Sequence, residues 1–84
     1  MKKIIMYTGP YCNYCEAAKR LFVRNNAPFN EIDISKVEGA MDEMIKKANG
    51  KRTIPQIFFD DKHIGGYDEV RALEKENKLQ DLLK

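Results

Sequence analysis

Two cysteines, Cys12 and Cys15, are the residues whose type and spacing most directly indicate chemistry in this sequence. They are the only cysteines in the chain, and they lie in the segment Gly9–Glu16, between a short apolar run and a run with helical spacing. Two thiols at a strand-to-helix junction, in a chain without a visible secretory signal, are typical of a redox pair. The pattern therefore predicts a reversible disulfide.

Cys12 is the predicted nucleophile. A thiolate attacks disulfides and a thiol does not, so the site must lower the thiol pKa from about 8.5. At a helix cap, the sulfur can accept from the backbone N–H groups of Tyr14 and Cys15 and lies at the positive end of the macrodipole. The dipole contributes at most ~2 kcal/mol, whereas a fall of about three pKa units requires roughly 4 kcal/mol. Lys19, two turns along the helix, is the candidate cation that tunes the pKa further.

Cys15 is the predicted resolving thiol. Residues three apart in a regular helix have Cβ atoms about 5–6 Å apart, whereas a disulfide requires about 3.5–4.5 Å. The pair can therefore close only if Cys12 lies just off the helix. We expect Cys12 to face outward and Cys15 to lie inside the first turn with less exposure.

A zinc site and a structural disulfide are the alternative interpretations of the pair. Tetrahedral zinc needs four ligands, and the chain adds only one histidine, His63, and carboxylates to the two cysteines. A structural disulfide suits secreted chains, and so short a loop constrains the unfolded chain little. We therefore favour redox chemistry, expect no metal, and assign His63 to a surface or partly packed position with no catalytic role.

Length and charge narrow the possible partners. The 84 residues predict one domain, residues 1–84. Fifteen Lys and Arg against 13 Asp and Glu give a net charge of +2, too balanced to indicate nucleic-acid binding. The apolar run after Lys3 is too short for a membrane span or a signal sequence. We expect a monomeric cytoplasmic protein without a nucleic-acid or membrane partner.

The hydrophobic pattern predicts an α/β domain with the element order β-α-β-α-β-β-α. The continuous apolar first strand favours a central parallel position, and the last two strands form a hairpin around an Asp-rich turn. A right-handed crossover in the first half and this hairpin give a mixed four-stranded sheet with helices on both faces. The predicted strands are Lys2–Thr8, Pro28–Ile34, Thr53–Phe59 and His63–Gly66, and the predicted helices are Asn13–Asn25, about Ser35 or Lys36 to Ala48, and a third from Asp68.

Individual residues predict the faces and ends of the later helices. The inward face of the second helix should comprise Val37, Met41, Met44, Ile45 and Ala48. Gly50 should end this helix, and Asp68 should be the N-cap residue of the third helix. Asn77 should interrupt the third helix, leaving a short helical turn that contains Leu79, Leu82 and Leu83.

Three sequence blocks stand together at specific spacings. They are Tyr11-Cys12-Asn13-Tyr14-Cys15 followed by Ala18-Lys19, then Arg52-Thr53-Ile54-Pro55, and finally Gly65-Gly66-Tyr67-Asp68. With these blocks, the chain resembles a glutaredoxin of the thioredoxin superfamily over essentially its whole length. The resemblance implies a thioredoxin-like fold and glutathione-dependent thiol–disulfide exchange. Cys12 would attack a glutathionylated substrate, and a second glutathione would release the enzyme or Cys15 would resolve a protein disulfide.

A glutathione site needs cations, backbone donors and one acid, because glutathione carries two carboxylates and one amine. Arg52, with Lys51 beside it, can take the glycyl carboxylate. Gly65 and Gly66 allow close backbone approach, and the start of the third helix offers N–H groups to the γ-glutamyl carboxylate. Asp68 can accept from the amine.

The resemblance implies two further features, in the loop before the hairpin. Ile54 would pair its backbone with the cysteinyl unit of glutathione, and the peptide bond before Pro55 would be cis. The complete predicted glutathione-binding set is Tyr14, Arg52, Thr53, Ile54, Pro55, Gly66, Tyr67 and Asp68.

Two departures from the family pattern lie near Cys12. Asn13 stands where many members have Pro, and Gly9 stands where members often have Lys, so one cation near Cys12 and the glutathione carboxylate is missing. The first departure is compatible with an iron–sulfur cluster carrier, in which a glutathione-bridged dimer shares the cluster through Cys12. A third possibility is an electron donor fed by thioredoxin reductase.

Overall fold

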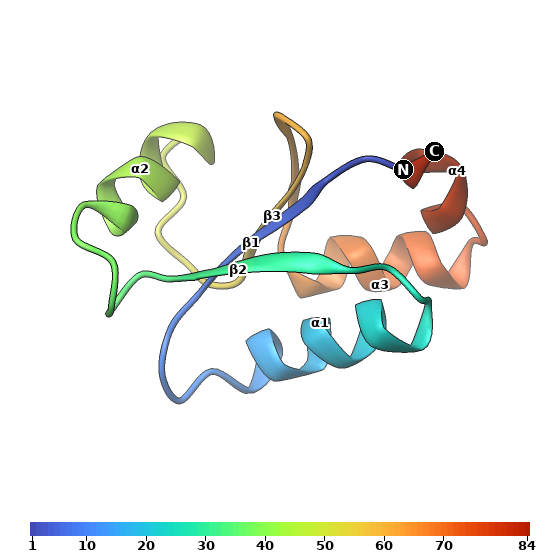
Figure 1. Ribbon diagram of the computed structural model, residues 1–84, viewed down its shortest axis with the longest axis horizontal. Helices are drawn as coiled ribbons and strands as arrows, with labels where there is room; N and C mark the ends of the chain where they lie inside the picture. The colour runs from blue at the N-terminus through green and yellow to red at the C-terminus, as the bar shows by residue number, and fades with distance from the viewer.

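Four strands form one mixed sheet at the centre of the computed structural model, which describes residues 1–84 (Figure 1). The strands are β1 (Ile4–Thr8), β2 (Phe29–Asp33), β3 (Gln56–Phe59) and β4 (Lys62–Gly65), in the spatial order β2-β1-β3-β4. β1 pairs parallel with β2 and antiparallel with β3, and β3 pairs antiparallel with β4. The predicted sheet and the central position of its first strand are confirmed.

Helices cover both faces of this sheet. α1 (Asn13–Arg24) and α3 (Tyr67–Lys75) lie on one side, and α2 (Ala40–Lys47) lies on the other, as Figure 1 shows. A short α4 (Leu79–Leu83) ends the chain. None of these helices is both long enough and apolar enough to cross a membrane. The arrangement is the thioredoxin-like α/β fold that the resemblance implies.

Alternation along β1 divides the core into two layers of different size. Successive side chains on a strand point to opposite faces of the sheet. Ile4 and Met6 accordingly belong to a cluster of 11 buried residues that includes side chains of α1 and α3. Tyr7 belongs to a cluster of 4 buried residues on the opposite face, where it lies with Met44 of α2. The larger layer therefore anchors α1, the helix that carries both cysteines.

The two ends of α2 differ in how well the sequence predicts them. The start is later than predicted, because the backbone N–H and the hydroxyl of Ser35 donate to Asp33 Oδ1 at 2.8 and 2.6 Å and hold a turn. The helix begins only after Gly39, whose φ is 77°. The predicted end is confirmed, since the N–H of Gly50 donates to the carbonyl oxygen of Ile45 at 2.8 Å.

The inward face of α2 is shorter than predicted for the same reason. Met44 and Ala48 are buried, as the pattern predicts. Val37 precedes the helix and is 50% exposed, and Met41 in its first turn is 42% exposed. The prediction that these two side chains face inward is wrong. For Val37 the reason is that a helix starting at residue 40 has no turn to place it against the sheet.

The start of α3 also differs from the prediction. Gly66 is the N-cap residue and Asp68 is the second residue of the helix, so the predicted cap role of Asp68 is wrong. Asn77, with a φ of 58°, separates α3 from α4, which confirms the predicted interruption.

Candidate active site

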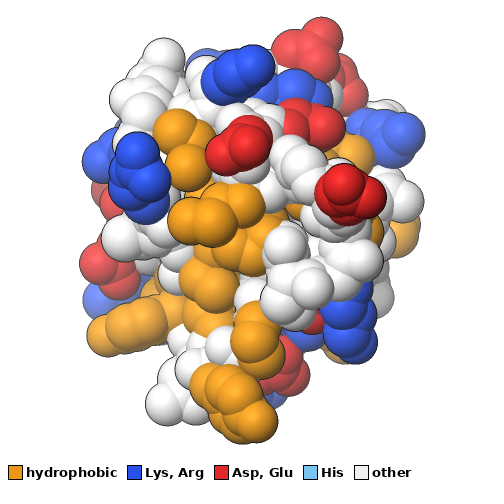
Figure 2. Space-filling model, turned by 90° about the vertical axis from the view of Figure 1, so that its left-hand side faces the viewer, with side chains coloured by type: hydrophobic (Ala, Val, Ile, Leu, Met, Phe, Trp, Pro, Cys, Tyr) orange, Lys and Arg blue, Asp and Glu red, His pale blue; other side chains and the backbone are white.

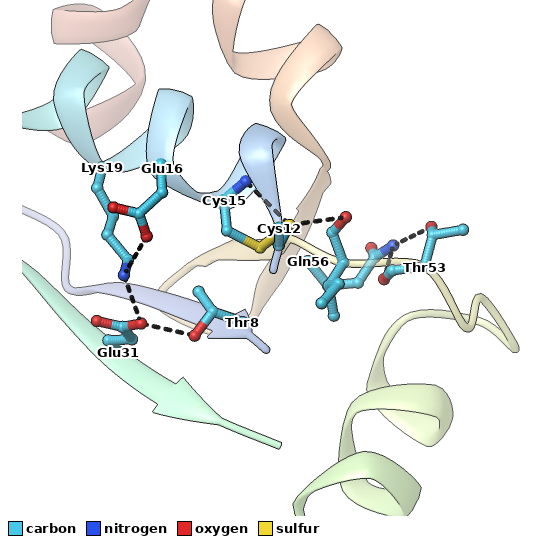
Figure 3. Close-up of a disulfide and its surroundings, with 9 residues drawn as sticks. Thr8, Cys12, Cys15, Glu16, Lys19, Glu31, Thr53 and Gln56 are labelled. Carbon is cyan, nitrogen blue, oxygen red and sulfur yellow. Dashed lines mark hydrogen bonds and ion pairs between the residues drawn. A yellow bond between two sulfur atoms is a disulfide. The ribbon is translucent and has the colours of Figure 1, made fainter. Parts of the chain in front are cut away.

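Cys12 and Cys15 form a disulfide at the start of α1 (Figure 3). Cys12 is the N-cap residue, with extended backbone at φ −114° and ψ 101°, and its sulfur accepts a hydrogen bond from the N–H of Cys15 at 3.1 Å. The two Cα atoms are 5.2 Å apart. The predicted cap position of Cys12 and the predicted donor at Cys15 are confirmed, whereas the N–H of Tyr14 makes no such bond.

The two cysteines differ in exposure in the predicted sense. Cys15 is 1% exposed, and Cys12 is half-buried. The backbone N–H that donates to Cys12 favours a charged sulfur there, as does the positive end of the helix. An incoming thiol or disulfide can therefore reach Cys12, while Cys15 is accessible mainly to Cys12.

A loop on the other side of the disulfide faces Cys12. The Ile54–Pro55 peptide bond in this loop is cis, and the carbonyl oxygen of Ile54 lies 3.8 Å from Cys12 Sγ. Gly9 allows this approach, because a Cβ at Gly9 would lie 2.7 Å from Ile54 Cδ1. The absence of a side chain at Gly9 thus has a steric reason in this chain.

A groove of about 240 Å³ lies between this loop, Tyr14 and the start of α3. Every residue of the predicted glutathione-binding set lines it except Arg52. Lys51, the neighbour of Arg52, lines the groove instead, so the cation at the groove is Lys51. Gln56 and Glu69 also line the groove, and neither was predicted. The binding roles of the predicted residues stay predictions.

Glu69 explains why two glycines precede α3. Its Oε1 accepts from the N–H of Gly66 at 2.6 Å, which is one half of a capping box. Gly65 has a φ of 130°, and a Cβ there would overlap the Glu69 carboxylate. A Cβ at Gly66 would lie 3.2 Å from the carbonyl oxygen of Pro55. The glycines therefore allow α3 to lie close to the opposing loop. The spacing from Gly66 to Glu69 is the sequence signal for the hydrogen bond between these two residues.

The first turn of α3 brings backbone donors to the groove. The N–H groups of Tyr67, Asp68 and Glu69 lack an acceptor within the helix, as in any first turn. They also lie at the positive end of the helix dipole. The Tyr67 ring lies against the Tyr14 ring, with centroids 6.0 Å apart and an interplanar angle of 31°. This end of the groove therefore suits an anionic group.

Lys19 extends toward β2 instead of toward the disulfide (Figure 3). Its Nζ lies 2.8 Å from Glu31 Oε2 and 2.9 Å from Glu16 Oε2. The hydrogen bonds to Glu31 and then Glu16 raise the pKa of Lys19, and the bond from Lys19 is the main cause of the lowered pKa of Glu31. Glu31 also accepts from the Thr8 hydroxyl at 2.6 Å. Two carboxylates thus offset the charge of Lys19, whose effect on Cys12 stays a prediction.

His63, the sole histidine, lies on β4 and contacts Gln56 at 2.7 Å between Nε2 and Oε1. No three side chains among His, Cys, Asp and Glu lie together in the structure as a group that could hold a metal ion.

A band of hydrophobic side chains crosses the face that holds the end of β1 and the start of α1 (Figures 1 and 2). Tyr11, which precedes Cys12, is 105% exposed and has a φ of 55°. Tyr14 in the first turn of α1, Val37 before α2 and Met41 in α2 are further exposed apolar side chains. The centre of this face is therefore largely apolar, with charged side chains around it in Figure 2.

Sequence comparisons identify close relatives over nearly the whole chain. The glutaredoxin family model matches residues 4–64. Glutaredoxin 1 of Rickettsia prowazekii is 44% identical over 81 residues, which cover 95% of this chain and 85% of the relative. Glutaredoxin 3 of Escherichia coli is 40% identical over 84 residues, which cover 100% of both proteins.

Solved structures with a similar fold are also glutaredoxins. The solution structure of glutaredoxin from Brucella melitensis has a TM-score of 0.85 and 48% identity, and the match covers 100% of this chain and 90% of that one. A buckwheat glutaredoxin in complex with glutathione has a TM-score of 0.85 and 30% identity, and the match covers 98% of this chain and 76% of the buckwheat chain. Because family model, relatives and fold agree and the Cys12–Cys15 pair is present, this chain belongs to the glutaredoxin family of thiol–disulfide oxidoreductases.

Proposed function

We propose that the chain uses glutathione to reduce both protein disulfides and glutathione mixed disulfides. The observation that carries the proposal is the position of Cys12. Its sulfur accepts a backbone N–H at the cap of α1 and lies 3.8 Å from the carbonyl oxygen of Ile54, a residue that lines the groove. A ligand in the groove would therefore have its thiol or disulfide close to the attacking sulfur.

The route through one thiol requires only Cys12. Its thiolate attacks the glutathionyl sulfur of a mixed disulfide, which forms a Cys12–glutathione disulfide and releases the substrate as a thiolate. The thiolate of a second glutathione attacks the bound glutathionyl sulfur. Oxidised glutathione leaves, and the electron pair of the broken bond returns to Cys12 as its thiolate.

The route through two thiols serves protein disulfides. Cys12 attacks one substrate sulfur and forms a mixed disulfide, while the other substrate sulfur leaves as a thiolate. The Cys15 thiolate then attacks the Cys12 sulfur, which releases the second substrate thiolate and forms the disulfide between Cys12 and Cys15. Two glutathione molecules reduce this disulfide and leave as oxidised glutathione.

The chemistry of the groove supports glutathione as the ligand. Lys51, with Arg52 beside it, is the proposed partner of the glycyl carboxylate. The first-turn N–H groups of α3 are the proposed donors to the γ-glutamyl carboxylate, and the exposed Asp68 is the proposed acceptor for the amine. The backbone of Ile54 would pair with the cysteinyl unit. The related buckwheat protein was solved in complex with glutathione, which supports the same ligand here.

The proposed working unit is a monomer, because both cysteines and the lining of the groove come from one chain. The proposed location is the cytoplasm, where the glutathione pool is kept reduced and can drive the cycle.

Turnover of a glutathione mixed disulfide tests the proposal directly. Oxidised glutathione is coupled to NADPH through glutathione reductase, and a parallel assay replaces glutathione and its reductase with thioredoxin reductase. We expect rapid turnover only in the glutathione assay and none after Cys12→Ala, because that variant lacks the attacking sulfur.

Other results of these two assays would indicate one of the two alternative functions, an electron donor fed by thioredoxin reductase or an iron–sulfur cluster carrier. Turnover only with thioredoxin reductase would contradict glutathione dependence and indicate a donor fed by that reductase. If both assays are silent and anaerobic reconstitution gives a brown dimer, the iron–sulfur carrier replaces the proposal.

A further inference from the structure

A hydrogen-bonded network of three polar side chains connects β4 to the loop that faces Cys12. The buried Gln56 of β3, only 2% exposed, lies at its centre. Its Nε2 donates to the carbonyl oxygen of Thr53 at 2.9 Å and to the Thr53 hydroxyl oxygen at 3.1 Å, both drawn in Figure 3. Its Oε1 lies 2.7 Å from Nε2 of His63. The sequence alone does not connect these residues, because they come from the loop, β3 and β4.

The donor and acceptor properties of the groups set the direction of every hydrogen bond in this network. A backbone carbonyl only accepts, so the side of Gln56 that faces Thr53 must be its NH₂ group. The amide oxygen of Gln56 therefore faces His63, and it too only accepts. The proton of His63 must consequently be on Nε2, both in the neutral ring and in the imidazolium.

The surroundings of His63 favour the neutral ring. The ring packs on Phe58 with centroids 5.0 Å apart. Burial and then the charge of Lys51 lower the pKa of His63, and the charge of Glu69 opposes this weakly. Lys51 and Glu69 both line the groove, so the two charges that act on His63 belong to the wall of the groove.

The hydrogen-bonded network ends at Thr53, which lines the groove and precedes Ile54. Its carbonyl and its hydroxyl oxygen both accept from Gln56, so the backbone and the side chain of Thr53 are held at once. The hydroxyl hydrogen of Thr53 is not used in these bonds and is available to a ligand. Ile54, the next residue, carries the carbonyl 3.8 Å from Cys12 Sγ.

We propose that His63 and Gln56 are positioning residues of the groove, which fix Thr53 so that its hydroxyl donates to bound substrate and Ile54 keeps its place beside Cys12. The inference rests on the proposed glutathione-dependent function. His63 touches no reacting atom in this arrangement, and its N–H acts through Gln56 alone. Loss of that N–H should therefore weaken substrate binding and leave the reactivity of Cys12 intact.

The test compares two variants at one position. His63→Phe keeps an aromatic ring for Phe58 and removes the N–H donor, whereas His63→Gln removes the ring and can keep an N–H near the position of Nε2. Losing one hydrogen bond should raise the KM for a glutathione mixed disulfide about fivefold with kcat unchanged, and His63→Gln should restore most of the affinity. Lys62→Gln, an exposed neighbour on β4, is the matched surface control.

The pH dependence and an NMR experiment test the direction of the hydrogen bond between His63 and Gln56. Because both forms of the ring keep the Nε2 proton, the ratio of KM between His63→Phe and the parent should be the same on either side of the histidine titration. Nitrogen-15 spectra of the parent should show the neutral ring protonated on Nε2. A ring protonated on Nδ1 would overturn the inference.

The activity outcomes distinguish this inference from the proposed function. A parent without glutathione turnover contradicts the proposed function, and the NMR result still decides the orientation of the network. An active parent with an unchanged KM in His63→Phe overturns the inference alone. If His63→Phe does not fold, Gln56→Met in the same assay takes its place, with the same expected rise in KM.

Discussion

At the scale of residues, the reactivity of Cys12 depends on the groups within reach of one sulfur atom. The N–H of Cys15 donates to it at 3.1 Å, and a hydrogen bond to a charged group contributes about 1.5–3 kcal/mol. The start of α1 adds up to about 2 kcal/mol. Near the upper ends of their ranges, these two sources together reach the roughly 4 kcal/mol needed to lower a thiol pKa by three units, so we expect Lys19 to contribute little.

Variants around Lys19 test how much its charge contributes. Lys19→Met removes the cation together with its two ion pairs, so we expect only about a twofold slower reaction of Cys12 at neutral pH. Glu31→Gln leaves Lys19 less neutralised and should shift the pKa of Cys12 in the opposite direction. Thiolate absorbance as a function of pH measures both shifts. A large rise in the pKa of Cys12 in Lys19→Met would instead restore Lys19 as the main tuning cation.

Replacing Cys15 separates the two routes of reduction. Cys15→Ser removes the resolving thiol but keeps the backbone N–H that donates to Cys12, so the nucleophile should stay activated. We expect turnover of glutathione mixed disulfides to be retained. Reduction of a protein disulfide should fall by more than about 100-fold, because an intramolecular attack becomes intermolecular. Loss of both activities in a folded variant would show that Cys15 does more than resolve.

At the scale of elements, a carboxylate joins the end of α1 to α3. Glu74 of α3 accepts from Nε and Nη2 of Arg24 at 2.9 and 2.7 Å and from Nδ2 of Asn25 at 2.6 Å. Arg71 adds a contact at 3.0 Å. The hydrogen bonds from Arg24 are the largest cause that lowers the pKa of Glu74 to about 2. This cluster therefore ties together the C-terminal ends of the two helices whose N-terminal ends form the site.

Loss of this carboxylate should weaken the fold. Glu74→Gln keeps the shape and removes the charge, and we expect a loss of about 1–2 kcal/mol in the free energy of unfolding at neutral pH. Glu76→Gln is the matched control, because Glu76 pairs only with Lys78 on the surface and should contribute little. Urea unfolding of both variants measures the difference. Equal effects of the two substitutions would contradict the role of Glu74.

Acid should remove the difference in the free energy of unfolding between Glu74→Gln and the parent. A carboxyl whose pKa is lower in the folded protein than in the unfolded chain stabilises the fold fully above its unfolded pKa of about 4.3. This stabilisation is lost as the pH falls through the folded pKa of about 2. The gap between parent and variant should therefore shrink progressively from about pH 5 to pH 2. A gap that does not change with pH would show that the effect of the substitution is not due to the charge.

At the scale of the whole molecule, the sheet brings three distant segments to one end. The turn into α1, the loop before β3 and the start of α3 meet beside the disulfide, because β1 is central and pairs with β3 (Figure 1). Each segment provides one part of the proposed chemistry: the sulfur, the backbone of Ile54, and the N–H donors of α3.

Much of this arrangement follows from local patterns in the sequence. The two-residue alternation of β1, the helical spacing of α1 and the cap position of Cys12 each depend on neighbours within a few residues. The late start of α2 was missed because the Ser35 bonds to Asp33 compete with helix formation, and propensity alone does not decide such a competition.

The sequence by itself determined the element order and the redox pair, and its resemblance to the glutaredoxins predicted all but one of the residues of the set that proves to line the groove, Arg52 being the exception. Only the tertiary structure decided which charges meet: Lys19 is paired with Glu31 across α1 and β2, and Lys51 replaces Arg52 at the groove. It also decided that His63 is connected through Gln56 to the loop beside Cys12. The reason is physical, since periodicity and caps act over one or two turns, whereas side-chain contacts between elements depend on how the sheet aligns residues far apart in the chain.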